Sequence, residues 1–411
     1  MFKLITNSWA LFLGYGVLII AHGLQGNLLG VRAVLENFNI IATGALMSGY
    51  FIGYFIGANV VPNLVGKVGH IRVFAAFAST ASLSILLHSV IVDPYVWIIG
   101  RFITGFSIIS IFVVVESWLN DRATNKTRGK VLSIYMIITF IGIGLGNLLL
   151  NFSSPKKYEP FILVSLLLSI ALVPILLTKR KPPKFKKIKS INMKELYNIS
   201  PLAAFSMFCT GFIHPAIFTM GAVYGALMNF SVLEISLYLF LITIAGALFQ
   251  WPIGYLSDRF DRRIILIFVT LIAAGLSIFI VISSYLSILV FFIILALYGG
   301  MSLPMYSLAI AHINDFLQPN EIVSASATFG ILVGIGAIMG PILASLFMRL
   351  SGPDGFFAYL FIVHLSLGLF GIYRMGKRIK PSDIESQYVP LPRNISTAGM
   401  ELNPKVEVNE K

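Results

Sequence analysis

The sequence predicts an all-α integral membrane protein with twelve transmembrane helices in two pseudo-symmetric six-helix bundles. Three observations predict this class: the apolar composition, the number of long apolar segments, and a similarity between the two halves of the chain. Of the 411 residues, 57% are hydrophobic and only 11% are charged. So few charged side chains cannot cover the surface of a water-soluble globule of this size, which excludes that class.

The apolar segments supply the helix count. A helix needs about 20 mostly apolar residues to cross the hydrocarbon of a bilayer. Strands of a β-barrel would instead alternate apolar and polar residues over about ten positions, and no such alternation occurs. The first segment is too long for the apolar region of a signal peptide and lacks a small-residue cleavage site, so we expect it to remain as the first helix. The predicted spans are residues 8–30, 40–61, 72–91, 95–118, 130–151, 158–178, 201–226, 232–256, 264–283, 287–311, 323–348 and 355–375.

The basic residues indicate which side of the membrane each loop faces. Lys and Arg number 30 against 17 Asp and Glu, which gives a net charge of +13. Most of them fall on the side of the N-terminus. Only Arg32, Lys156, Lys157 and Arg349 fall on the other side, and Arg101 lies within a span. Because Lys and Arg gather in cytoplasmic loops, we expect both termini to be cytoplasmic.

A basic segment, residues 179–200, separates the six spans of residues 1–178 from the six spans of residues 201–375. Its run KRKPPKFKKIK can be interpreted as a nucleic-acid patch, but a cytoplasmic linker that touches anionic lipid headgroups explains it better. We therefore expect membrane lipid, and no nucleic acid, as a partner. The polar residues 376–411 contain four prolines and show no periodicity, so they are expected to form a largely disordered cytoplasmic tail.

The two halves of the chain resemble each other at one fixed offset. Adding 192 places Gly142 on Gly334 and His22 on His214, with the linker at the midpoint. Duplicated halves around a central site are typical of secondary transporters. The two histidines then occupy equivalent places in the first and seventh spans, where an imidazole could carry protons or bind an acidic group of a substrate. The alternative is a histidine that only hydrogen-bonds a neighbouring helix.

The turn between the eighth and ninth spans carries the most specific short motif. Its residues are Gly254, Asp258, Arg259, Arg262 and Arg263. A glycine at a helix end lets a neighbouring helix approach, and an acid followed by arginines can form a charge cluster; alternatively, the arginines only anchor the loop. The order resembles motif A of the major facilitator superfamily. This resemblance covers about residues 8–375 and implies a major facilitator fold that works by rocker-switch alternating access, with Asp258 and Arg259 helping to latch the inner gate.

The corresponding loop of the first half departs from that pattern. It keeps glycine and basic residues at Gly66, Lys67, Gly69 and Arg72, but Gly66 stands where motif A has its acid. A latch on this side therefore needs a different acid, and Glu116 at the end of the fourth span is the candidate. Its place is similar to that of a glutamate that pairs with motif A arginines in sugar-porter members of the superfamily. The alternative is an interfacial residue whose carboxylate reaches water.

Arg101 lies about six residues into the fourth span, where a charge costs about 2.5–3.5 kcal/mol on insertion scales. The stretch from Gly100 to Gly105 resembles motif B of the superfamily, R-x-x-x-G. The resemblance implies that Arg101 faces the cavity and takes part in proton coupling or in binding an anionic substrate. The alternative is an arginine near the outer interface that reaches the headgroups. Glu234, in contrast, follows Ser231 in a capping box, which predicts a helix start at the membrane surface.

Two further stretches narrow the resemblance. Residues 116–120 close the fourth span, residues 304–315 close the tenth, and both look similar to a bacterial branch of the superfamily, the YcaD-like transporters. This resemblance implies the inner membrane of a bacterium. Within the second stretch, Tyr306 and Asn314 are polar residues that could line the inner half of a transport path or could equally bond to helix backbones.

Neither direct use of ATP nor enzyme chemistry is indicated. No glycine-rich phosphate loop, metal-ligand spacing or nucleophile elbow occurs, and the single cysteine, Cys209, excludes an internal disulfide. We therefore expect a transporter without cofactor, metal or catalytic residues: a monomeric secondary carrier of a small solute, coupled to protons. An uncoupled facilitator is the nearest alternative. A non-transporting receptor or scaffold would need a large partner-binding domain or a long ordered tail, and only the short segment of residues 376–411 is available for either.

Overall fold

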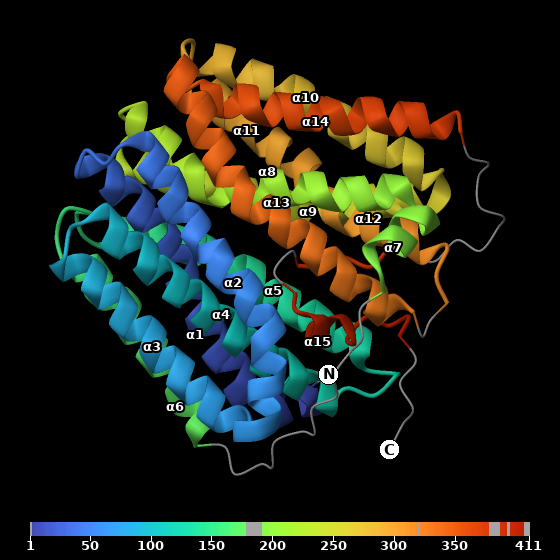
Figure 1. Ribbon diagram of the computed structural model, residues 1–411, viewed down its shortest axis with the longest axis horizontal. Helices are drawn as coiled ribbons and strands as arrows, with labels where there is room; N and C mark the ends of the chain where they lie inside the picture. Colours follow the sequence, from blue (N-terminus) through green and yellow to red (C-terminus); the bar gives the residue numbers. More distant parts are fainter. Residues whose placement is uncertain (1, 178–190, 319–320, 378–386, 393–394, 407–411) are drawn as a thin grey trace. The chain divides into compact units, whose positions relative to one another are not determined.

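The computed structural model describes residues 2–177, 191–318, 321–377, 387–392 and 395–406 (Figure 1). Within these ranges the regular structure is helical and contains no strand. Twelve helical segments of the described chain are long and apolar enough to cross a membrane, which confirms the predicted all-α membrane class. The basic run KRKPPKFKKIK of the predicted linker lies outside the described residues.

The chain forms two compact units. Unit 1 comprises Met1–Lys189 and Asn394–Lys411, and unit 2 comprises Ser190–Arg393. The division between them falls within the predicted linker, residues 179–200, so each unit contains one of the two predicted sets of six spans. The tail is shared between the units, which the sequence did not predict.

The helices of unit 1 pack in a fixed set of pairs. They are α1 (Phe2–Leu35), α2 (Ile40–Val68), α3 (His70–Val90), α4 (Pro94–Arg122), α5 (Arg128–Leu148), η1 (Leu149–Phe152) and α6 (Glu159–Leu176). Helix α2 lies along α4, α1 packs against α5 and α6, and α3 packs against α4 and α6. A Cβ atom at Gly53 would overlap the carbonyl of Phe102, and one at Gly105 would overlap the carbonyl of Tyr50. The backbones of α2 and α4 therefore touch, and Gly105 of the motif B stretch is a packing residue.

The helices of unit 2 repeat these pairs. They are α7 (Met193–Ile199), α8 (Pro201–Leu227), α9 (Val232–Arg259), α10 (Arg262–Ser284), α11 (Ile288–Ser302), α12 (Met305–Asn314), α13 (Ile322–Ser351) and α14 (Gly355–Met375). Helix α9 packs on α11, α8 on α13 and α14, and α10 on α11 and α14, as the offset of 192 requires. The tenth predicted span is two helices, α11 and α12, because Pro304 between them lacks a backbone donor.

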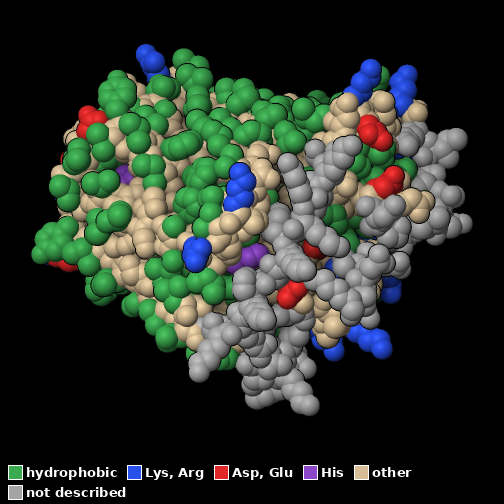
Figure 2. All heavy atoms as spheres, turned by 60° about the horizontal axis from the view of Figure 1, so that its bottom comes forward, with side chains coloured by type: hydrophobic (Ala, Val, Ile, Leu, Met, Phe, Trp, Pro, Cys, Tyr) green, Lys and Arg blue, Asp and Glu red, His purple; other side chains and the backbone are tan. Residues whose placement is uncertain are grey.

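Large apolar side chains are exposed along both bundles. Trp251 on α9 is 78% exposed, Leu83 on α3 is 64% exposed and Ile99 on α4 is 61% exposed. Hydrophobic side chains cover much of the face shown in Figure 2. Apolar surface of this extent is unfavourable in water, so we assign these helix faces to contact with lipid.

Part of the C-terminal tail is folded, which differs from the expectation that residues 376–411 are largely disordered. Residues 387–392 and 395–406 pack on the bundles, and the second piece contains the short helix α15 (Thr397–Met400). Their buried apolar side chains are Tyr388, Leu391, Ala398, Met400, Leu402 and Val406. The expectation rested on average polarity and on the lack of periodicity. A few apolar side chains spaced along an irregular segment can nevertheless be buried by a bundle surface.

Candidate functional site

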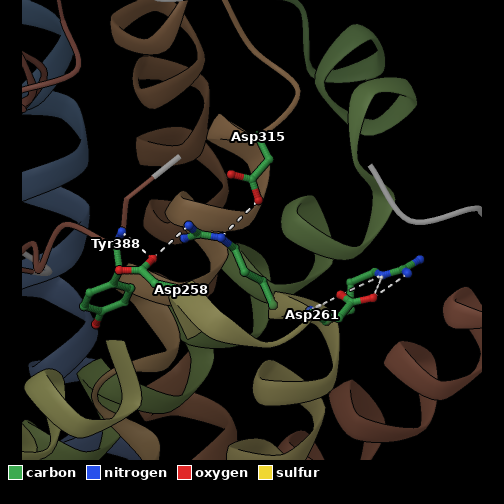
Figure 3. Close-up of polar contacts among 6 residues, drawn as sticks. Asp258, Asp261, Asp315 and Tyr388 are labelled. Atoms are coloured by element: carbon green, nitrogen blue, oxygen red, sulfur yellow. Dashed lines mark hydrogen bonds and ion pairs between the residues drawn. The ribbon is translucent and has the colours of Figure 1, made fainter. Parts of the chain in front are cut away.

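A largely buried cluster of charges joins three helix ends of unit 2 (Figure 3). Asp258 lies in the last turn of α9, Arg262 begins α10, and Arg262 Nη2 is 3.0 Å from Asp258 Oδ1. The same guanidinium reaches Asp315, which follows α12, with Nε 3.1 Å from Oδ2. The side chains of Arg262 and Asp315 are only 3% and 5% exposed. Arg262 is therefore the buried centre of an ion-pair cluster, which goes beyond the alternative in which it only anchors the loop.

The other arginines of the motif are placed differently. Arg259 is exposed, and its guanidinium lies 4.0 Å from the ring centroid of a tyrosine on its own helix. Arg263 binds Asp261, with Nη2 2.6 Å from Oδ2, and Asp261 also caps α10. Burial acts to raise the pKa of the Asp261 carboxyl, but the hydrogen bonds and charge of Arg263 outweigh it and hold that pKa below its ordinary value. The basic partner of Asp258 is thus Arg262, whereas Arg259 forms no ion pair with an acid that the structure describes.

The tail piece 387–392 covers the same cluster. The backbone N–H of Tyr388 donates to Asp258 Oδ1 over 2.7 Å (Figure 3). Its phenol donates to Gln250 on α9. The Tyr388 ring lies against Gly254, where a Cβ atom would overlap it. The motif glycine therefore accommodates a tyrosine of the tail, where the sequence had suggested a neighbouring helix.

Among the side chains that the structure describes, the corresponding turn of unit 1 holds no comparable cluster. Lys67 and Arg72 are exposed and form no ion pair with any acid that the structure describes. Gly66 is exposed in the last turn of α2, and Gly69 joins α2 to α3 with a φ of 95°, a conformation that favours glycine. The glycine that stands in place of the motif A acid is thus accompanied by a turn whose described basic residues form no ion pair.

His70, for which the sequence indicated no role, ties this turn to α4. Its Nε2 lies 2.7 Å from Ser117 Oγ, and its ring stacks on Trp118 at a centroid distance of 5.9 Å. His70 is the first residue of α3, so the tie links the start of α3 to the last turns of α4. In the sequence, the only indication of this link between helices is the position of the histidine, directly after the glycine that ends α2.

Glu116 is fully buried near the end of α4, so the alternative in which its carboxylate reaches water is wrong. The Tyr135 hydroxyl of α5 donates to Oε1 over 2.5 Å, and the backbone N–H of Ser396 in the tail donates to Oε2 over 2.8 Å. Lys67 and Arg72 do not pair with it. The glutamate that the resemblance suggested as a latch is therefore held by a tyrosine and by the tail.

Arg101 is buried in unit 1 without a carboxylate partner among the described residues. It is 2% exposed, so it does not extend to the surface of the protein. Its guanidinium lies 4.6 Å from the ring centroid of Tyr50, and the ring of His22 stacks on the same tyrosine ring with the two centroids 5.6 Å apart. The buried Gln25 donates to Thr104, one turn from Arg101. The structure thus brings Arg101 and His22 together around one tyrosine.

His214 has a different environment from its counterpart His22. Its Nε2 lies 3.0 Å from the carbonyl oxygen of Ser302 at the end of α11. The Ser302 hydroxyl lies 3.2 Å from Nε2 of His364 on α14, a residue to which the sequence gave no role. The two halves therefore do not form a matched pair of histidine sites, and His214 serves at least to tie α8 to the broken span.

Tyr306 and Asn314 are both buried on α12, each 7% exposed. Asn314 directly precedes Asp315 of the ion-pair cluster, so the structure places it beside the motif A residues. No three His, Cys, Asp or Glu side chains of the described ranges come together as a metal site.

Comparison with known proteins identifies the family. The model of the Major Facilitator Superfamily matches residues 11–310 and 200–394. YcaD of Escherichia fergusonii, described as an uncharacterized MFS-type transporter, is 23% identical over 341 residues, which cover 82% of this chain and 87% of that protein. YcaD of an Escherichia coli strain is 23% identical over 343 residues with the same coverage. These matches extend over both bundles.

Solved transporter structures share the fold. The nucleoside transporter NupG has a TM-score of 0.73 at 14% identity, covering 90% of this chain and 98% of that chain. A bacterial homologue of the human lysosomal transporter Spinster, in an inward-facing and occupied conformation, has a TM-score of 0.71 at 14% identity, covering 92% and 98%. At such identities the likeness is one of fold.

Proposed function

The chain belongs to the major facilitator superfamily, and we propose that it is a secondary active transporter that moves a small anionic solute by alternating access, coupled to protons. The family consists of membrane transporters, and the solved structures that share the fold are transporters as well. We place it in the inner membrane of a bacterium with both termini in the cytoplasm. The proposed partners are the solute, protons and membrane lipid.

The observation that carries this proposal is a pair of buried ionisable side chains on one helix. Arg101 and Glu116 are separated on α4 by about 22 Å of helix axis, so neither neutralises the other by contact. Neither has an ion-pair partner among the described residues. Ionisable side chains within membrane spans are costly and typically mark the path of a substrate or an ion.

Arg101 is the proposed site for the acidic group of the solute. A guanidinium offers five N–H donors in a plane, which fits the oxygens of a carboxylate or phosphate. Its contact with the Tyr50 ring fixes the orientation of that plane, and His22 lies against the same ring. An anionic solute would supply the counter-charge that this arginine lacks.

Glu116 is the proposed proton carrier. Its two oxygens accept from a tyrosine hydroxyl and from a backbone amide, and both donors favour the charged form. Loss of either donor would favour protonation of the carboxyl. A movement that changes these contacts therefore couples the protonation of Glu116 to the conformation of the bundle.

The proposal is tested with purified protein in liposomes loaded with a pH-sensitive dye. A pH gradient is imposed, and monocarboxylates, dicarboxylates, sugar phosphates and uncharged nucleosides are added separately. We expect at least one anionic class, and no uncharged nucleoside, to accelerate proton entry. Arg101→Ala should abolish that response. Arg349→Ala, which removes an exposed arginine of α13, is the matched control and should retain it.

Two outcomes contradict parts of the proposal. If proton-driven uptake survives the combined changes Arg101→Ala, His22→Ala and His214→Ala, these residues do not couple protons to the solute. If a solute enters equally fast with and without the gradient, the protein is an uncoupled facilitator.

A further inference from the structure

The C-terminal tail supplies a hydrogen-bond donor to one acid of each bundle, the partly exposed Asp258 in unit 2 and the buried Glu116 in unit 1. In unit 2 the N–H of Tyr388 donates to Asp258 over 2.7 Å, and in unit 1 the N–H of Ser396 donates to Glu116 over 2.8 Å. We propose that the end of each bundle carries a peptide-binding site and that the ligand of both sites is the tail of this same chain. Its two docked pieces, residues 387–392 and 395–406, inhibit transport while they are bound.

The site on unit 1 is complementary to the tail in charge. Arg128 donates to the backbone carbonyl of Glu401, and Asn120 donates to the Glu401 carboxylate. Gly399 lies against Glu116, and a Cβ atom there would be 2.6 Å from the carboxyl carbon. A backbone donor of the tail thus faces the Glu116 carboxylate, and acceptors of Glu401 face the Arg128 guanidinium and the Asn120 side-chain amide. Such complementary pairing is typical of a specifically bound peptide.

Burial completes the site on unit 1. Leu402 and Asn403 are 0% exposed and Met400 is 2% exposed, whereas Pro404 remains at the surface. The segment is too short to hold this conformation alone, since its only regular element is the single turn of α15. Its order therefore comes from the bundle surface on which it is seated.

The site on unit 2 binds both backbone groups and a side chain of the tail piece 387–392. The Ser307 hydroxyl on α12 accepts from the backbone N–H of Leu391 over 3.1 Å and lies 3.4 Å from its carbonyl oxygen. The Tyr388 ring fills the space left by Gly254, and its hydroxyl donates to Gln250. A residue with a side chain at position 254 would close this space, so the motif glycine has a use specific to the tail.

The inhibitory role rests on the proposed transport function. Alternating access changes the positions of the two bundles relative to each other. Residue 392 is docked on unit 2 and residue 395 on unit 1, and only two residues connect them. A movement that separates the two sites must therefore release one piece. Release leaves Asp258 or Glu116 without its amide donor, so docking opposes that movement.

Docking is tested on the full-length chain by thiol labelling. In a Cys209→Ser background, Ala398→Cys places a single thiol in the buried segment, which should react slowly with a maleimide. Adding Gly399→Val, whose side chain would overlap the Glu116 carboxyl, should raise the labelling rate about tenfold or more. Pro404→Ala, at an exposed position of the same segment, is the control and should leave labelling slow. Equal rates with and without Gly399→Val overturn the docking.

A peptide tests the site without relying on a variant's own fold. A fluorescent peptide of residues 395–406 should bind the full-length Gly399→Val chain, and the same peptide carrying Gly399→Val should not. It should bind the unmodified chain far more weakly, because the tethered segment competes at an effective concentration on the order of millimolar. Absence of binding to the Gly399→Val chain, or equal binding of the two peptides, overturns the site.

The inhibitory role is measured in the liposome assay. Gly399→Val should raise the initial rate about tenfold if the docked state holds roughly 90% of the molecules. The added peptide is not joined to the piece on unit 2, so it should bind without lowering that raised rate. If the Gly399→Val chain and the unmodified chain transport the solute at equal rates while the peptide still binds, the inhibition is overturned. If no solute moves with either chain while the peptide still binds, the transport proposal and the inhibition fail together and the peptide site stands.

Discussion

His70 and Arg262 are the first residues of equivalent helices, α3 and α10, and each ties its helix to the end of the fourth span of its bundle. His70 Nε2 lies 2.7 Å from Ser117 Oγ on α4, and Arg262 Nε lies 3.1 Å from Asp315 Oδ2 after α12. Position 70 plus the offset of 192 is position 262. The two halves thus keep the same mechanical link, made by a neutral hydrogen bond in one and by a buried ion pair in the other.

The ion-pair cluster predicts a strong difference between two arginines of the same turn. Arg262→Met leaves the 5% exposed Asp315 carboxylate without its cation, which should cost about 3–5 kcal/mol of stability. Arg259→Met removes an exposed cation–π contact and should cost no more than about 1 kcal/mol. Thermal unfolding in detergent, followed by tryptophan fluorescence, should show the larger drop in Tm for Arg262→Met. Equal drops would mean that the cluster does not hold the turn.

Asp261 predicts a pH dependence at the same turn. Because Arg263 holds the pKa of Asp261 below its ordinary value of 3.8, the ion pair stabilises the fold above that pH. The contribution is lost as pH falls through the lowered folded-state pKa. Asp261→Asn should keep the helix cap and lose the charge. Its Tm deficit relative to the unmodified chain should be constant between about pH 5 and 8 and should disappear under more acidic conditions. A deficit that persists in acid would assign the effect to the cap.

The membrane spans could be predicted because lipid imposes length and polarity on each helix separately. The capping box could be predicted for a similar reason, since its bonds are local: Ser231 Oγ accepts from the Glu234 N–H, and the Glu234 carboxylate accepts from the Ser231 N–H. The break at Pro304 was missed because hydropathy continues through it, although the missing donor of the proline was visible.

The partners of the charged residues could not be predicted from the sequence. Asp258 pairs with Arg262 because α9 ends at Arg259 and a two-residue turn brings the next helix back beside it. The ends of helices are the least certain part of a sequence-based prediction. The tail was misjudged because its order comes from tertiary contacts, such as the bond from Ser396 to Glu116, that no local pattern encodes.

We predict that removing the Tyr135 hydroxyl lowers stability more than removing the hydroxyl of an exposed tyrosine, because the hydrogen bond of Tyr135 is buried. Tyr135→Phe leaves one oxygen of the fully buried Glu116 without its donor and should cost about 1–3 kcal/mol. Tyr285→Phe removes a similar bond, to Asp354, at a side chain that is 69% exposed, and should cost less than about 0.5 kcal/mol. Comparing the two Tm values checks this. A larger drop for Tyr285→Phe would show that Glu116 does not depend on the tyrosine.

We predict that Gly105 of the motif B stretch is required for packing between α2 and α4 and not for binding of the solute. Gly105→Ala places a methyl group against the carbonyl of Tyr50 and must push α2 away from α4, at about 1–3 kcal/mol or more. Gly66→Ala, within the same bundle, meets no atom within 4 Å and should be neutral or stabilising by about 0.5–1 kcal/mol, because alanine favours a helix.

The two alanine variants differ only in what surrounds the added methyl group, so their Tm values can be compared directly. Gly105→Ala should lower Tm and Gly66→Ala should not. Transport that is lost in Gly105→Ala should return when the bundle is stabilised, for example at a lower assay temperature, because Arg101 and Tyr50 are unchanged. If Gly105→Ala retains full stability but loses transport at every temperature, the glycine belongs to the solute path and the packing explanation is wrong.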